Sequence, residues 1–229
     1  MRRSILVLLS CCALVFTGRS QTLPQLLKTA WQPFYTTGFD VTIDVKVYSG
    51  PLKLTTVYKS NTRYQKLGSD MLLTSAGVEQ LINNQVMLHA DKTDRLLMIG
   101  NQPEKTGAMP LISLDSLVGL SEEYLETSIS AAMVTKDAKG NKCYSFTNPS
   151  PEFKKIELWF NSRQLLERMV LVAIAEGDND PNPVIEYSFT HRPAPTDKSI
   201  FALSRFGALK NKKFTPSAAF RNYEIMVQL

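Results

Sequence analysis

Cysteine and histidine are scarce in this chain, and this scarcity excludes the common kinds of metal site. The 229 residues include three cysteines and two histidines. His89 falls inside a predicted strand, whereas His191 stands at a predicted strand end, where we expect it to be exposed. A zinc site needs three or four ligands that converge on one point. Since the two histidines lie far apart and no cysteine stands near either of them, we expect no metal centre.

The motifs of the common enzyme classes are also missing. The chain has no Gly-x-Ser-x-Gly elbow and no glycine-rich phosphate loop before a helix. The acidic stretch Asp178–Asp180 lacks the glycine and the terminal glutamate of a calcium loop, so we interpret it as a solvated turn. With no pair of nucleophile and base in view, the sequence favours a protein that is not an enzyme and needs no cofactor.

The first twenty residues have the layout of a secretory signal peptide. Arg2 and Arg3 precede Ser4–Phe16, which is mostly apolar. This apolar stretch is too short to cross a bilayer comfortably. We therefore expect residues 21–229 to form a single secreted domain, located in the periplasm.

Two cleavage positions remain open. Gly18 and Ser20 are small and would occupy the −3 and −1 positions of a cut before Gln21. Alternatively, Leu8–Cys11 resembles the cleavage box of a bacterial lipoprotein, and a cut there would lead to lipidation of Cys11. The first cut leaves a soluble periplasmic chain, and the second leaves a lipid-anchored one.

The charge balance gives no argument for nucleic-acid binding. The whole chain carries a net charge of +5, from 26 basic and 21 acidic residues. Three of the arginines and no acid lie in the predicted signal peptide, which leaves 23 basic against 21 acidic residues, or +2.

Cys143 is then the only cysteine, so no intramolecular disulfide can form. Its strand-like surroundings predict a small buried apolar side chain.

Apolar and polar residues alternate with a period of two in Phe39–Ser49, which predicts a strand with one wet face. The Ser-Gly dipeptide at its end predicts a two-residue hairpin turn. In that hairpin Val47 would pair with Leu52 and Val45 with Leu54, leaving one apolar face that needs a cover.

The remaining pattern is mostly that of short antiparallel strands. An amphipathic helix is predicted from Leu23 to near Pro33, one or two short helices are predicted within residues 111–126, and Phe206–Phe220 is expected to be irregular and basic. Further strands are predicted at residues 61–68, 70–75, 78–82, 85–90, 95–99, 128–135, 142–146, 154–160, 165–176, 184–190 and 223–227. The fold class is therefore α+β, mainly antiparallel β, as a curved incomplete barrel (half-barrel) covered by short helices.

This order of elements resembles the periplasmic outer-membrane lipoprotein carrier (LolA-like) family. The matching segments are Phe39–Val47, Thr56–Tyr64, Leu73–Val78 and Lys155–Leu166. The resemblance implies an incomplete barrel that holds lipid acyl chains in an apolar cavity closed by helices. Arg63 stands roughly where the carriers have a functional arginine, although the proline that accompanies it there is missing.

The pattern and the resemblance together indicate one set of side chains for the cavity and one for its lid. The residues expected to line the cavity are Val45, Val47, Leu52, Leu54, Arg63, Ile156, Leu158 and Phe160. The residues expected to cover it are Leu114, Leu117 and Val118. The alternative is that the same side chains fill an ordinary core.

Two functions remain open at this point. The first is a periplasmic, non-enzymatic carrier for lipoprotein acyl chains or another apolar lipid. Burying about fourteen methylenes is worth roughly 10 kcal/mol at ~0.8 kcal/mol each, so such a site needs no polar anchor. The second is an envelope protein–protein interaction module that shares the fold and docks a partner through a sheet edge or through the basic segment Phe206–Arg221.

Overall fold

The computed structural model describes residues 23–101, 133–149, 151–175, 177 and 181–228. The predicted signal peptide, Cys11 included, lies outside the described residues. So do the predicted lid residues Leu114, Leu117 and Val118, and the acidic stretch Asp178–Asp180.

Strands dominate the described chain, as the alternation predicts. The predicted N-terminal helix is present as α2 (Leu23–Trp31), and it is followed by the 3-10 helix η1 (Gln32–Tyr35). The strands are β1 (Gly38–Tyr48), β2 (Thr56–Leu67), β3 (Asp70–Ser75), β4 (Val78–Ile82), β5 (Met87–Asp91), β6 (Leu96–Gly100), β7 (Met133–Lys136), β8 (Lys142–Thr147), β9 (Phe153–Phe160), β10 (Leu166–Ala173), β11 (Val184–Arg192), β12 (Gly207–Lys210), β13 (Lys213–Pro216) and β14 (Glu224–Gln228). Three further 3-10 helices are η2 (Lys198–Phe201), η3 (Leu203–Arg205) and η4 (Ala218–Phe220).

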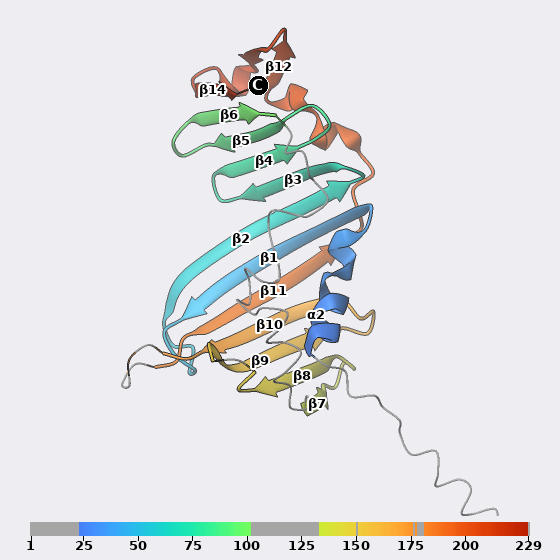
Figure 1. The fold of residues 1–229 in the computed structure, drawn as a ribbon, viewed down its shortest axis with the longest axis vertical. Helices are drawn as coiled ribbons and strands as arrows, with labels where there is room; N and C mark the ends of the chain where they lie inside the picture. Colours follow the sequence, from blue (N-terminus) through green and yellow to red (C-terminus); the bar gives the residue numbers. More distant parts are fainter. Residues whose placement is uncertain (1–22, 102–132, 150, 176, 178–180, 229) are drawn as a thin grey trace, which may run out of the picture.

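Twelve of these strands form one sheet, in the order β14-β6-β5-β4-β3-β2-β1-β11-β10-β9-β8-β7. Neighbouring strands run antiparallel, except that β14 pairs with β6 in parallel. The sheet is curved and not closed (Figure 1), which fits the predicted half-barrel. Cover by helices is seen only in small part, because α2 is the one α-helix among the described residues.

One core lies on the side of the sheet that carries α2, which we call the helix face. In β1 the alternate residues Val41 and Ile43 are buried on this face. Leu26, Leu27 and Ala30 of α2 pack with them. The helix-face core continues across the strands as Phe39, Tyr64, Leu73, Tyr144, Phe146, Phe153, Ile156, Leu158, Phe160, Leu166, Met169, Leu171, Tyr187 and Phe189, together with Phe34 of η1.

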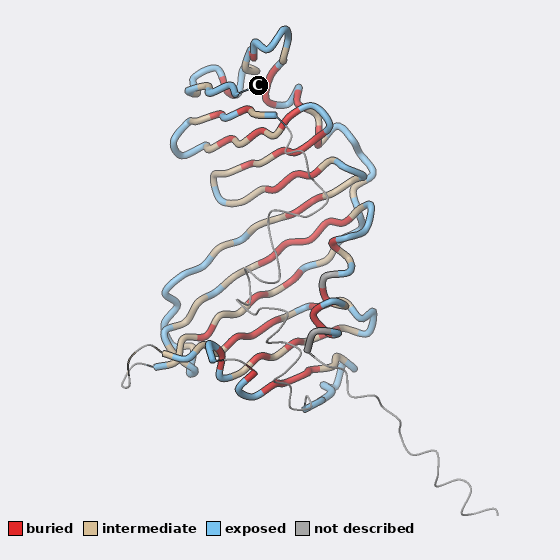
Figure 2. Tube along the Cα trace, viewed as in Figure 1, coloured by how far each residue is buried: buried red, intermediate tan, exposed pale blue. Residues whose placement is uncertain are grey.

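A second core lies on the opposite side, the back face, because Leu72 aligns through Gln65 with Asp40 and not with Val41. Buried residues are seen in this half of the sheet also (Figure 2). Leu72, Leu81, Val86, Leu88, Ala90, Leu97 and Ile99 from the β3–β6 region are buried there against Phe201, Leu203, Phe206, Phe214 and Phe220 of the C-terminal segment. The neighbours Leu72 and Leu73 of β3 therefore belong to different cores. The buried face of the sheet changes sides near this strand.

The predicted two-residue hairpin between β1 and β2 was wrong. Val47 pairs with Tyr58, and the connecting loop is closed by the Ser49 amide, which donates to the Thr55 carbonyl at 3.1 Å. A turn directly after Tyr48 would place Pro51 in the paired strand, where it has no N–H to donate. The longer loop instead leaves Leu52 and Leu54 exposed, with 78% and 86% of their surface accessible.

The segment Phe206–Phe220, expected to be irregular, contains the hairpin of β12 and β13. Asn211 and Lys212 both have positive φ angles, 50° and 61°, as the two-residue type I′ turn requires. The sequence shows Asn-Lys where Asn-Gly is the usual signature of this turn. The buried phenylalanines of this segment cover the back face of the sheet.

Replacing Leu88 by alanine tests the back-face core. Leu88 is fully buried, so the Leu88→Ala variant should lose about 2–5 kcal/mol of unfolding free energy, measured by urea denaturation. The control is Met98→Ala on the neighbouring strand, where the side chain is 39% exposed. An equal or smaller loss for Leu88→Ala than for Met98→Ala would contradict the second core.

Candidate ligand-binding site

Four of the predicted cavity residues come together on the helix face. Ile156, Leu158 and Phe160 of β9 are buried in the helix-face core, and Val45 of β1 packs against its margin. Val47, two residues further along β1 on the same face, is half-buried. The alternation in β9 and β1 thus predicted correctly which side chains share a face. In the structure these side chains pack against other protein side chains.

Leu52 and Leu54 lie in the exposed β1–β2 loop, outside this core. Arg63 lies on the back face, because it pairs with Thr42, and residue 42 alternates with the buried Val41 and Ile43. The structure therefore does not bring these three predicted residues together with Ile156.

Arg63 forms a two-pronged ion pair with a buried carboxylate. Its Nε donates to Asp40 Oδ1 at 3.0 Å and its Nη2 donates to Asp40 Oδ2 at 2.6 Å. The hydrogen bond to Asp40 raises the pKa of Arg63 above its ordinary value, against an opposing effect of burial. Asp40 is only 5% exposed and also accepts a bond from Gln65 Nε2 at 3.3 Å. Arg63 thus compensates a buried charge, which is a structural role.

A second ion-pair group occupies the back face beside β11. Glu186 accepts from Lys53 and forms an ion pair with Arg168, whose Nε lies 2.8 Å from Oε1. Burial acts to raise the pKa of Glu186, but the hydrogen bonds from Lys53 and Arg168 outweigh it and lower the pKa. This half of the back face is therefore polar and held together by charge pairs.

The structure contains a pocket of about 420 Å³ at the end of α2, which we call the helix-end pocket. It lies where β1 begins and β11 ends, beside η1 and the β9–β10 turn. Its lining residues are Thr29, Gln32, Pro33, Thr36, Gly38, Phe39, Asp40, Gln164, Leu165, His191, Arg192 and Ala194. None of the predicted cavity residues is among them.

The helix-end pocket has an apolar wall and a polar rim. Phe39 belongs to both the pocket lining and the helix-face core, and its ring meets Phe34 edge-on with centroids 5.2 Å apart. His191, expected to be exposed, is half-buried, and its Nε2 lies 2.8 Å from the Leu166 carbonyl oxygen. Because a carbonyl can only accept, Nε2 carries the hydrogen of this bond. The pocket therefore joins solvent to the helix-face core.

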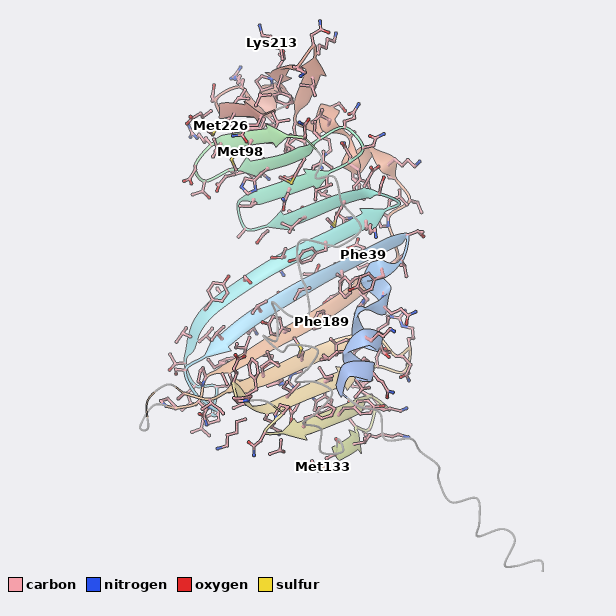
Figure 3. All side chains as sticks on the ribbon, viewed as in Figure 1. Phe39, Met98, Met133, Phe189, Lys213 and Met226 are labelled. Atoms are coloured by element: carbon pink, nitrogen blue, oxygen red, sulfur yellow. The ribbon has the colours of Figure 1, made fainter. Side chains whose placement is uncertain are left out.

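Beyond α2 the helix face carries a row of mixed apolar and polar side chains. Leu73, His89, Met98 and Met226 follow one another across β3, β5, β6 and β14, with Gln80 of β4 between the first two. Met98 and Met226 are exposed neighbours at the β14 edge of the sheet (Figure 3). Methionine adapts its shape to apolar partners, so Met98 and Met226 form a small exposed apolar patch at this edge of the sheet.

Cys143 is a buried side chain of β8, as its surroundings predict. Burial, together with the nearby charge of Glu157, raises the pKa of the Cys143 thiol to about 11.

Within the described ranges no three His, Cys, Asp or Glu side chains are grouped as metal ligands. No helix in this part of the chain has the length and apolarity needed to span a membrane.

No family model matches this chain, and no curated protein does either. Among solved structures, it is similar to an uncharacterized conserved protein from Thermus thermophilus, with 10% identity, a TM-score of 0.39, and coverage of 79% of this chain and 93% of that one. It is also similar to a LolA superfamily protein from Nitrosomonas europaea, with 10% identity, a TM-score of 0.32, and coverage of 81% and 99%.

A third similar structure is the MucA/MucB complex from Pseudomonas aeruginosa, with 10% identity, a TM-score of 0.41, and coverage of 78% of this chain and 60% of that one. A LolA-superfamily structure is thus among the neighbours. At these identities and TM-scores the comparisons assign neither a family nor a function.

The thiol of Cys143 should resist alkylation in the folded protein. With a pKa of about 11, only on the order of 0.1% of the thiol is ionised at pH 8, and the thiolate is the reactive form. We expect iodoacetamide at pH 8 to modify the Cys143 peptide at least tenfold more slowly in native protein than in urea, measured by peptide mass spectrometry. Equal rates would contradict its burial.

The ion pairs of Glu186 should make stability fall with acidification. The lowered pKa means that ionised Glu186 stabilises the fold above the unfolded pKa of about 4.5, and that this contribution is lost as the pH falls through the lower folded value. Urea denaturation between pH 7 and pH 3 should therefore show a weaker pH dependence for Glu186→Gln than for wild type. Glu224→Gln, an exposed residue of β14, is the control. Parallel pH profiles for wild type and Glu186→Gln would contradict this role.

Proposed function

We propose that the protein is a secreted envelope binding protein that carries an apolar ligand, an acyl chain of a lipoprotein or another lipid, without changing it chemically. The observation that carries this proposal is the helix-end pocket, which connects solvent with the helix-face core beside Phe39. Its volume of about 420 Å³ falls within the usual range of ligand pockets, roughly 300–1,000 Å³. The predicted signal peptide supports the assignment to the envelope.

An acyl chain would enter at the pocket and extend between α2 and the sheet. The α2 side chains Leu26, Leu27 and Ala30 now cover this region, and a small shift of a nine-residue helix would open it. The side chains that would then line the compartment are Val45, Val47, Ile156, Leu158 and Phe160. Each methylene buried there contributes about 0.8 kcal/mol, so a chain of ordinary length binds usefully. The predicted cover by Leu114, Leu117 and Val118 stays a prediction.

A second candidate function is an interaction module of an envelope assembly. The observation in its favour is β7, which ends the sheet order and carries the exposed apolar residues Met133 and Val134. Among the described residues no strand pairs with the outer edge of β7, and an edge of this kind can add a strand from a partner.

Lipid analysis of the secreted protein separates the two functions. For the carrier, organic extraction followed by mass spectrometry should recover an acyl species at close to one per protein. Ala194 lines the pocket at the surface, so an Ala194→Trp variant should fill the entrance and lower the recovered ligand several-fold. The control is Ala218→Trp, an exposed alanine of η4 outside the pocket.

Thermal denaturation of both variants checks that neither substitution unfolds the protein. A secreted protein that contains no acyl species and binds none when offered would exclude the carrier. If that empty protein captured a defined envelope partner and lost it on substitution of Met133 or Val134, the interaction module would be the correct function.

A further inference from the structure

A histidine and two methionines stand side by side at the β14 edge of the helix face. His89 of β5 pairs with Met98 of β6, and Met98 pairs in turn with Met226 of β14. Neighbouring strands lie about 4.8 Å apart, and residues paired in this way point to the same face. Met98 and Met226 lie next to each other in Figure 3. One imidazole and two thioethers therefore project from a single row of the sheet.

The three side chains are accessible and make few commitments to the rest of the fold. Met98 and Met226 are 39% and 43% exposed, and neither belongs to one of the two cores. His89 is half-buried, and among the described residues its ring has no partner in a hydrogen bond or an ion pair. The lone pairs of one ring nitrogen and two sulfur atoms are thus available to a ligand.

A further thioether and an amide flank this row. Met87 of β5 pairs with Gly100, two residues from Met98 in β6, so no side chain at Gly100 separates the two methionines. Diagonal neighbours of this kind are within reach of long side chains. On the other side Gln80 of β4 pairs with His89. Its amide oxygen can accept a hydrogen bond from one ring nitrogen and leave the other free.

The charges on this part of the helix face favour a cation. Asp91 and Glu224 stand in the next row of the same face, on either side of one β6 residue. In the turn before β6, Lys92 is directed to the back face, where its Nζ donates to Glu79 Oε1 at 2.6 Å. Arg95 is the other basic residue of this turn. Two carboxylates therefore face one guanidinium beside the row, and their field attracts positive ions.

We propose that His89, Met98 and Met226 bind a Cu(I) ion at the β14 edge of the helix face, with Met87 in reach as a fourth ligand. Thioether sulfur is a soft ligand that selects Cu(I) over harder ions, and imidazole also suits copper. The scarcity of cysteine and histidine argues against a zinc centre but not against this one, because methionine supplies most of its ligands. The site is separate from the helix-end pocket, so the inference does not depend on the proposed carrier function.

Competition with bicinchoninate, a chelator that is coloured when it holds Cu(I), measures the affinity of the secreted protein under anaerobic conditions. We expect one Cu(I) per chain to move from the chelator to the protein, and an excess of Zn(II) to leave this transfer unchanged. X-ray absorption spectra of the complex should show both sulfur and nitrogen around the copper, with sulfur in the majority.

Variants that remove a ligand atom but keep the side-chain volume identify the site. Met98→Leu and Met226→Leu should each weaken Cu(I) binding at least tenfold, and His89→Gln should also remove nitrogen from the X-ray absorption spectrum. Met133→Leu is the matched control, since Met133 is an exposed methionine of β7 at the opposite edge of the sheet. Cys143→Ala removes the buried thiol of β8 and should leave the affinity unchanged.

Circular dichroism of the metal-free variants checks that each of them is folded. A wild-type protein that withdraws no Cu(I) from bicinchoninate would overturn the inference, and so would Met98→Leu and Met226→Leu variants that bind as tightly as wild type. Binding that is lost in Cys143→Ala and kept in Met98→Leu would assign the ion to the thiol instead. None of these results changes the amount of lipid recovered from the protein, so the carrier function stands or falls separately.

Discussion

The architecture depends on the constraint that a strand presents alternate side chains to opposite faces of its sheet. In the half formed by β1 and β8–β11 the apolar set points to the helix face, where α2 lies. In the half formed by β3–β6 the back face holds the second core, against the C-terminal segment. The buried face of the sheet changes sides at Leu72 and Leu73, which are adjacent in the chain and belong to different cores. One sheet can therefore carry two covers, one on each of its faces.

Local pattern in the sequence was sufficient to predict most elements but not their partners. The alternation in β1 and β9 and the apolar stripe of α2 each follow from a few neighbouring residues, and the structure confirms these elements. The pairing of β1 with β11 and of β6 with β14 joins distant segments, and alternation marks a face without naming the strand beside it. The loop after Tyr48 was mispredicted because the effect of Pro51 on the ladder outweighed the Ser-Gly turn signature.

For the candidate site, too, the sequence predicted one part and missed another. The periodicity identified Ile156, Leu158 and Phe160 as one apolar surface, and the structure places them together. The helix-end pocket could not be found from periodicity, because its lining comes from the ends of α2, β1 and β11 and from a turn. The link between Asp40 and Arg63 depends on the register of two strands, a property that neither residue carries alone. Sites built at element ends therefore need the fold before they can be recognised.

The parallel strand β14 has a consequence for the order of assembly. It pairs with β6 from a position more than one hundred residues further along the chain, and β11 joins β1 across a similar separation. Contacts of such high contact order form slowly, since the entropy of closing a long loop must be overcome first. During folding this edge of β6 therefore has no partner strand until β14 reaches it. A partly folded chain is open to aggregation at such an edge until β14 pairs with it.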